Sequence, residues 1–141
     1  MPKKVERLHW PDAPDVWAPF VPVIKVTGGS LVFLAGMTAA KAYHSHPHRP
    51  EEFDDMPTDM EGQAREIFRK MKISLDTAGG ALSDVVAVTR FLKDVNQQDA
   101  LNAVWAENFG DHRPTTTTVE VVRMTTDPRC LVEVTAIAVV D

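Results

Sequence analysis

The sequence predicts one domain, residues 1–141, with a two-layer α/β sandwich in which two helices cover one face of a mixed β-sheet. A chain of 141 residues is long enough to bury a sizeable core. Two stretches carry apolar residues at three- and four-residue steps, which is the spacing of one helical face, and β-rich runs surround them. The expected order is β-β-α-β-α-β-β. Because helices separate successive strands, at least some strands are expected to pair in parallel.

The N-terminal part is predicted to contain an arm, two strands and a loop. Residues 1–17 are rich in proline and form the expected N-terminal arm, which is extended or wraps the domain. In "VIKVTGGSLVFLAGMT" two β-rich runs surround a glycine pair, Gly28-Gly29, and this pattern predicts a hairpin. Residues 40–58 are polar and interrupted by prolines, so a surface loop is predicted there.

The later part is predicted to alternate helices with strands. A helix begins near Asp59, with a capping box of Thr58 and Glu61, and ends at the glycine pair 79–80. The elements that follow are a strand in "SDVVAVTRFL", a shorter helix over 97–109, and strands over 115–124 and 130–140.

Two helices can cover only one face of such a sheet. Apolar residues run almost continuously through 31–34 and recur through 131–140, which is typical of strands buried on both faces. A second subunit is therefore expected to cover the other face, and functional sites are expected near subunit boundaries.

Composition excludes several classes of protein. Fifteen basic and twenty acidic residues give a formal charge of −5, so general binding to nucleic acid is not expected. The single cysteine, Cys130, permits neither an intrachain disulfide nor a multi-cysteine metal site, and a buried inert thiol is expected. The N-terminus shows no apolar signal-peptide core and no stretch is long enough to span a membrane, so a cytoplasmic protein is expected.

Three segments resemble the Rid family, the reactive intermediate deaminases that are also called the YjgF or L-PSP family. They are "GGALSDVVAVTRFLKDV", "LNAVWAENFGDHRPTTTTVEV" and "LVEVTAIAVV". The resemblance implies a six-stranded mixed sheet packed by two helices, in a chorismate-mutase-like homotrimer with a barrel-like centre and clefts between subunits. It also implies hydrolysis of reactive enamines and imines, such as 2-aminoacrylate, to a keto acid and ammonia, with no metal or organic cofactor.

The family motifs map unevenly onto the chain. The glutamate that holds the attacking water corresponds to Glu133, the helix asparagine to Asn102, and the strand-end glycine of the cleft to Gly36. The chain departs from the family at three positions. Phe20 replaces the cleft tyrosine, Met37 replaces a polar residue, and Thr116 replaces the arginine that clamps the substrate carboxylate.

The departure at Thr116 predicts altered substrate anchoring. Guanidinium binds a carboxylate through two parallel charge-assisted bonds, whereas a hydroxyl offers one donor and no charge. Thr116 and Thr118 share a strand face and would form a neutral, hydroxyl-lined wall. Arg129, just ahead of the last strand, is a candidate replacement anchor, and its alternative is a solvated surface arginine.

The resemblance makes Glu133 the predicted catalytic residue. A carboxylate within "LVEVTAIA" is costly to bury unless it has a partner, which is a physical reason to expect a site there. The alternatives are an exposed edge-strand glutamate or a structural pair with Arg123 or Arg129. The predicted function is hydrolytic deamination of a small enamine, imine or related C–N compound, and an aminomuconate suits the altered site better than 2-aminoacrylate. Two alternatives are a non-catalytic trimer that binds a metabolite or a partner protein, and, more weakly, an endoribonuclease.

The segment "HSHPH" places His44, His46 and His48 at alternate positions, and histidine is a frequent zinc ligand. Pro47 and Pro50 disrupt regular structure, and no fourth ligand is marked beyond Glu51, Glu52, Asp54 or Asp55. A His-rich tract is only a compositional signal. No bound metal is therefore expected, and the segment is interpreted as a mobile loop that covers a neighbouring cleft.

Overall fold

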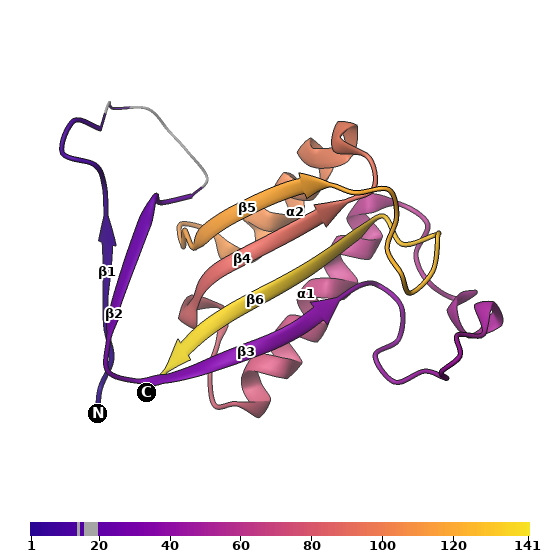
Figure 1. Ribbon diagram of the computed structural model, residues 1–141, viewed down its shortest axis with the longest axis horizontal. Coiled ribbons are helices and arrows are strands. Elements are labelled where there is room, and N and C mark those ends of the chain that lie inside the picture. The colour runs from indigo at the N-terminus through magenta and orange to yellow at the C-terminus, as the bar shows by residue number, and fades with distance from the viewer. Residues whose placement is uncertain (14, 16–19) are drawn as a thin grey trace.

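Two α-helices pack on one face of a four-stranded sheet in the computed structural model, which describes residues 1–13, 15 and 20–141 (Figure 1). The sheet contains β3 (Ser30–Met37), β4 (Val85–Leu92), β5 (Thr115–Glu120) and β6 (Val132–Val140). The helices are α1 (Met60–Thr77) and α2 (Gln98–Phe109). This arrangement confirms the predicted two-layer sandwich with both helices on one face.

The strand order in this sheet is β3-β6-β4-β5. The C-terminal strand β6 is antiparallel to both of its neighbours, whereas β4 and β5, which α2 connects, are parallel. The parallel pairing expected from the helix crossover is therefore confirmed. The strand order places β3 and β5 at the two edges of the sheet.

The six strands found in the described residues fall into two sheets, so the prediction of a single six-stranded sheet is wrong for this part of the chain. The other two strands, β1 (Lys4–Leu8) and β2 (Val23–Thr27), form an antiparallel ribbon that stands beside the main sheet (Figure 1). The strand β1 lies within the predicted N-terminal arm, while Trp17 of that arm lies outside the described residues.

The predicted hairpin across Gly28-Gly29 is also wrong, because β2 pairs with β1 and not with β3. Both glycines have positive φ, 75° and 74°. A Cβ at Gly28 would lie 2.5 Å from the Pro2 carbonyl oxygen, and one at Gly29 would lie 2.8 Å from the Val140 carbonyl oxygen. The glycines thus allow the N-terminal strand and the end of β6 to approach closely, and the long-range contacts decide the pairing.

The helix boundaries lie within two residues of the predicted ones. At the start of α1 the cap is Asp59, whose side chain accepts a hydrogen bond from the Gly62 N–H at 3.2 Å, so Thr58 does not form the expected capping box. Gly79 follows the helix with φ of 76°, as a C-terminal glycine does. Within the described ranges, no helix combines the length and apolar character that crossing a membrane requires.

The core lies between the helices and the sheet. Apolar side chains of both helices meet those of β4 and β6, among them Ile67, Phe68, Met71, Leu75, Leu101, Val104, Trp105, Val88, Val132 and Val134. The rings of Phe68, Trp105 and Phe109 contact one another with centroids 5.1–5.4 Å apart. These are the apolar faces that the helical spacing predicts.

The predicted surface loop 40–58 is fixed by a small core of its own. Phe53, in the 3₁₀ helix Pro50–Phe53, is buried with Ala40, Met56 and Cys130. Cys130 is fully buried, and burial raises the pKa of its thiol, in agreement with the inert thiol expected. The loop is therefore anchored through apolar contacts at several points rather than being a free cover.

His112 joins the β1–β2 ribbon to the main domain, and acid is expected to weaken this link. Its Nε2 lies 2.7 Å from the Val85 carbonyl oxygen and its Nδ1 lies 2.9 Å from the Arg7 guanidinium. A neutral ring with Nε2–H donating and Nδ1 accepting satisfies both contacts. Burial lowers the pKa of His112 below its ordinary value of 6.5.

Because the unfolded chain binds this proton more readily, His112 contributes stability above pH 6.5 that is lost as the pH falls through its folded pKa. Chemical denaturation between pH 8 and pH 5 should show the free energy of unfolding falling more in the wild type than in His112→Gln. Equal pH dependence of the two proteins would contradict the assignment.

Candidate functional site

The sheet face opposite the helices carries no helix and mixes apolar with polar side chains, and its apolar residues on β3 are exposed in the single chain. By register, it carries Leu31, Phe33, Thr89, Phe91, Thr117, Val119, Glu133, Thr135 and Ile137. Leu31 is 65% exposed and Phe33 is 69% exposed, although both are large apolar side chains. We call these side chains the open face. Such an apolar patch is typical of an interaction surface.

Glu133 lies on the open face at the start of β6. It lines a hollow of about 150 Å³ together with Phe91, Val121, Arg123, Met124 and Thr125. Within the described part of the chain, no lysine or arginine forms an ion pair with its carboxylate. Glu133 is half-buried, so its carboxylate is accessible to a small molecule in the hollow.

Gly36 lies directly against this carboxylate. A Cβ at Gly36 would be 2.5 Å from Glu133 Oε2, a distance at which one of the two groups must move. The close approach coincides with the irregular register of β3 and β6 between Leu34 and Met37. The predicted pair of Glu133 and Gly36 is therefore brought together, and glycine is required there for steric reasons.

A second group of polar residues lies on the helix side of the sheet, around Arg90. Its Nε donates to Thr118 Oγ1 at 2.9 Å, and one terminal nitrogen donates to Asn102 Oδ1 at 2.8 Å. The guanidinium carbon lies 4.8 Å from the centroid of the Trp105 ring. We call Arg90, Asn102, Trp105 and Thr118 the arginine cluster.

Arg90 is an unusual cation because it is only 4% exposed and no carboxylate among the described residues pairs with it. Burial lowers its pKa to about 10. A buried guanidinium without a counter-ion is costly, and its neutral partners compensate only in part. An anionic group at this point would be strongly stabilised.

The remaining predicted residues occupy different places. Thr116 is on the same strand face as Thr118, and its hydroxyl donates to the Pro114 carbonyl oxygen at 3.3 Å. Met37 is buried in the main core, and Phe20 is exposed.

The guanidinium of Arg129 already donates hydrogen bonds to groups of this chain, which argues against its binding a substrate anion. Its guanidinium donates to Asp127, to Asp54 at 2.8 Å and to the Pro50 carbonyl oxygen at 2.7 Å. These bonds hold the loop 40–58 to the start of β6.

One chain therefore does not assemble all of the predicted site. Glu133 and Gly36 are on the open face, whereas Asn102, Thr116 and Thr118 are on the helix side. The sequence reasoning missed Arg90, although a signal was available. In "VVAVTRFL" it has the same parity as Val88 and Leu92, so alternation places its charge on the buried face.

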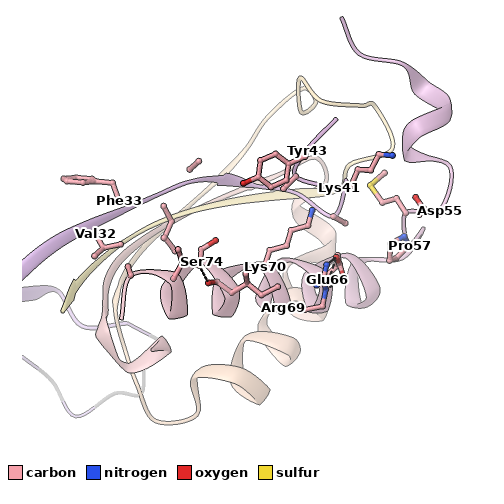
Figure 2. A pocket seen from close by; sticks show the side chains of 18 residues that line it. Val32, Phe33, Lys41, Tyr43, Asp55, Pro57, Glu66, Arg69, Lys70 and Ser74 are labelled. Atoms are coloured by element: carbon pink, nitrogen blue, oxygen red, sulfur yellow. Dashed lines mark hydrogen bonds and ion pairs between the residues drawn. The ribbon is translucent and has the colours of Figure 1, made fainter. Parts of the chain in front are cut away.

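A larger groove of about 1030 Å³ runs between the edge strand β3 and α1. In Figure 2, Lys70 extends from α1 toward the loop below Tyr43, and its amino group donates to the Thr38 carbonyl oxygen at 2.9 Å. Burial lowers the pKa of Lys70. This groove contains neither Glu133 nor any member of the arginine cluster.

The family model described as endoribonuclease L-PSP matches residues 11–140, which is nearly the whole chain. This chain belongs to the Rid (YjgF/L-PSP) family. A RutC family protein of Pyrococcus horikoshii is 35% identical over 133 residues, which cover 94% of this Rid protein and 96% of that relative. The 2-iminobutanoate/2-iminopropanoate deaminase of Escherichia coli is 29% identical over 131 residues, which cover 91% and 92% of the two chains.

The fold of this Rid protein is likewise that of solved family members. The crystal structure of Escherichia coli TdcF with bound serine matches with a TM-score of 0.66 and 28% identity, and the match covers 92% of this chain and 94% of that one. Deaminases thus occur by name among its relatives, and one structural neighbour holds a small amino acid.

Proposed function

We propose that this Rid protein is a hydrolytic deaminase of a small reactive enamine or imine, active as a homotrimer with sites between subunits. The observation that carries the proposal is the half-buried carboxylate of Glu133, packed against Gly36 in a small hollow on the open face. A relative named for the deamination of 2-iminobutanoate and 2-iminopropanoate supports the reaction type.

The proposed chemistry requires one carboxylate and one water molecule. Glu133 orients the water molecule and accepts a proton from it while the water oxygen attacks the carbon of the C=N bond. The tetrahedral intermediate carries a hydroxyl and an amino group. Glu133 returns its proton to the nitrogen as this intermediate forms. It then transfers the hydroxyl proton to the amino group while the C–N bond breaks, so that an imine and water give a carbonyl compound and ammonia.

Assembly is supported by where the two halves of the site lie. Another copy laid against the open face would remove Leu31 and Phe33 from water, and burying such side chains favours association by about 1.5–3 kcal/mol each. A site formed between copies would combine Glu133 of one subunit with the arginine cluster of another through a heterologous contact, in which the helix side of the second copy meets the open face of the first and access opens to Arg90, which is 4% exposed in the single chain. Closed rotational symmetry, as in a trimer, satisfies every such contact.

In this proposal the arginine cluster binds the substrate anion in place of the family arginine, which Thr116 replaces. Arg90 pairs with Thr118 across β4 and β5, two residues from Thr116 on the same face. We assign to its guanidinium the binding of an anionic substrate group, which requires that assembly open a path to this side chain, since it is 4% exposed in the single chain. The predicted substrates are carboxylate-bearing enamines whose anion lies at a different place from that of 2-aminoacrylate, and aminomuconates are one such class.

Glu133→Gln tests the catalytic role. The amide cannot accept the proton of the water, so ammonia release from freshly generated imines should fall by about 100-fold or more. The control is Glu107→Gln, because Glu107 is an exposed glutamate paired with Arg65 on the helix side, and it should be fully active. Unchanged activity in Glu133→Gln would refute the assignment.

A non-catalytic trimer that binds a metabolite or a partner protein is the second candidate, and Thr116 in place of the family arginine favours it. Measurements on the wild-type protein distinguish the deaminase from the binding protein. If the wild type binds a carboxylate ligand in calorimetry but releases no ammonia from a panel of imines, it is a binding protein. The charge of −5 makes endoribonuclease activity the weakest of the three candidates.

A further inference from the structure

Three imidazole rings converge in the loop between β3 and α1, away from the site described above. His44, His46 and His48 have ring centroids 4.8–5.1 Å apart. One ligand nitrogen from each ring lies within 4.8 Å of the others. We call His44, His46 and His48 the histidine cluster. The prolines of this segment, which disfavour a regular strand, are compatible with this compact arrangement.

The ring of His44 is already oriented as a metal ligand requires. Its Nδ1 lies 2.8 Å from the Lys41 carbonyl oxygen, and a carbonyl can only accept a hydrogen bond. The proton therefore resides on Nδ1, which leaves the Nε2 lone pair free. A ring nitrogen that donates to a backbone carbonyl is the usual outer contact of a metal-binding histidine.

The backbone around the cluster is held in place. The rings of His44 and His48 contact the edge or face of Phe53, with centroids 5.1 and 6.0 Å away, and Phe53 is buried. The Ser45 N–H donates to the Glu52 carboxylate at 3.3 Å. The loop therefore presents the three rings from a fixed frame, which reduces the entropy lost on binding an ion.

We propose that the histidine cluster binds a divalent transition-metal ion of the Zn²⁺ class through three imidazole nitrogens, with the fourth position open to water. Three neutral imidazoles with an open position suit zinc, and nickel and copper share the preference. Zinc–nitrogen bonds of about 2.1 Å place ligand nitrogens roughly 3.4 Å apart in a tetrahedron, so the widest pair must close by roughly 1.4 Å. His46 and His48 are exposed and can rotate by this amount.

The site is independent of the proposed deaminase activity. The Glu133 hollow contains none of the three histidines, and the ion is assigned to the loop. Binding would fix the loop 40–58 beside the groove between β3 and α1, since Tyr43 and Lys41 line that groove.

Calorimetric titration of Zn²⁺ into untagged, chelator-treated protein tests the proposal. The expected result is one ion per chain, with a dissociation constant in the micromolar range or below. Replacing zinc with Co²⁺ should give visible absorption bands of four- or five-coordinate geometry.

His46→Asn should weaken Zn²⁺ binding at least 10-fold. The matched control is His9→Asn, because His9 is exposed and lies outside the loop. Circular dichroism checks that both variants are folded. Absence of a one-to-one complex in the wild type, or equal affinity in His46→Asn and wild type, would overturn the proposal.

Discussion

Arg90→Met is expected to lower kcat/KM for a carboxylate-bearing imine by a factor of about 30 to several thousand. Methionine fills much of the same volume and keeps contact with Trp105, but it supplies neither charge nor hydrogen bonds. Loss of one partner from a buried charge pair costs about 2–5 kcal/mol, which corresponds to this range of rates. The Thr118 hydroxyl and the Asn102 amide would also lose their donor.

The measurement is steady-state ammonia release from two imines that differ only in a carboxylate or its methyl ester. Arg90→Met should lose activity on the acid while the ester changes by less than 5-fold. Arg65→Met is the matched control, because Arg65 is an exposed arginine whose charge is paired with Glu107 outside the arginine cluster. An equal loss on both substrates would show that Arg90 supports the fold rather than the anion.

Introducing an arginine at position 116 tests whether the altered substrate anchoring is due to Thr116 alone. Thr116→Arg restores the family residue at its usual position and should permit hydrolysis of 2-aminoacrylate, in the wild-type background and in Arg90→Met. If neither protein gains that activity while both remain folded, the cleft differs from the family at more than this position.

The local spacing of apolar residues was sufficient to locate the helices, but it was insufficient to predict which strands pair with one another. The three- and four-residue spacing of apolar side chains located α1 and α2 within two residues, because the buried faces are set by periodicity. The glycine pair at 28–29 fits a hairpin equally well, but close approaches to Pro2 and Val140 use its positive φ instead. Such contacts join residues far apart in the chain and leave no local signal.

The same distinction applies to the candidate site. Family motifs located Glu133 and Gly36, and the structure places them in contact. Arg90 was hidden because a charged residue within a strand usually faces water, and only its parity with Val88 and Leu92 indicates burial. The three histidines were evident in the sequence, but their convergence was not expected, because the shape of an irregular loop depends on Phe53 and on the packing beneath it.

Phe33→Asp is expected to dissociate the assembly and, with it, the activity. In the single chain the Phe33 ring is 69% exposed, lies directly opposite Ile137 and shares its face with Leu31. If this face is the interface, an aspartate there would be desolvated without a partner, which costs several kcal/mol in each subunit. A closed trimer repeats the defect three times, so the loss should be complete at micromolar concentration.

Light scattering on a size-exclusion column measures this directly. Wild type should elute as three chains of 15.6 kDa, about 47 kDa, and Phe33→Asp as one chain with an unchanged circular dichroism spectrum. Ile73→Asp is the matched control, since Ile73 is an exposed apolar residue on α1, and it should remain trimeric and active. Because Glu133 and the arginine cluster lie on opposite faces, a folded single chain should bind carboxylates weakly and release no ammonia. A single-chain particle for wild type would refute the trimer, and full activity in a dissociated Phe33→Asp would mean that the site is complete within one subunit.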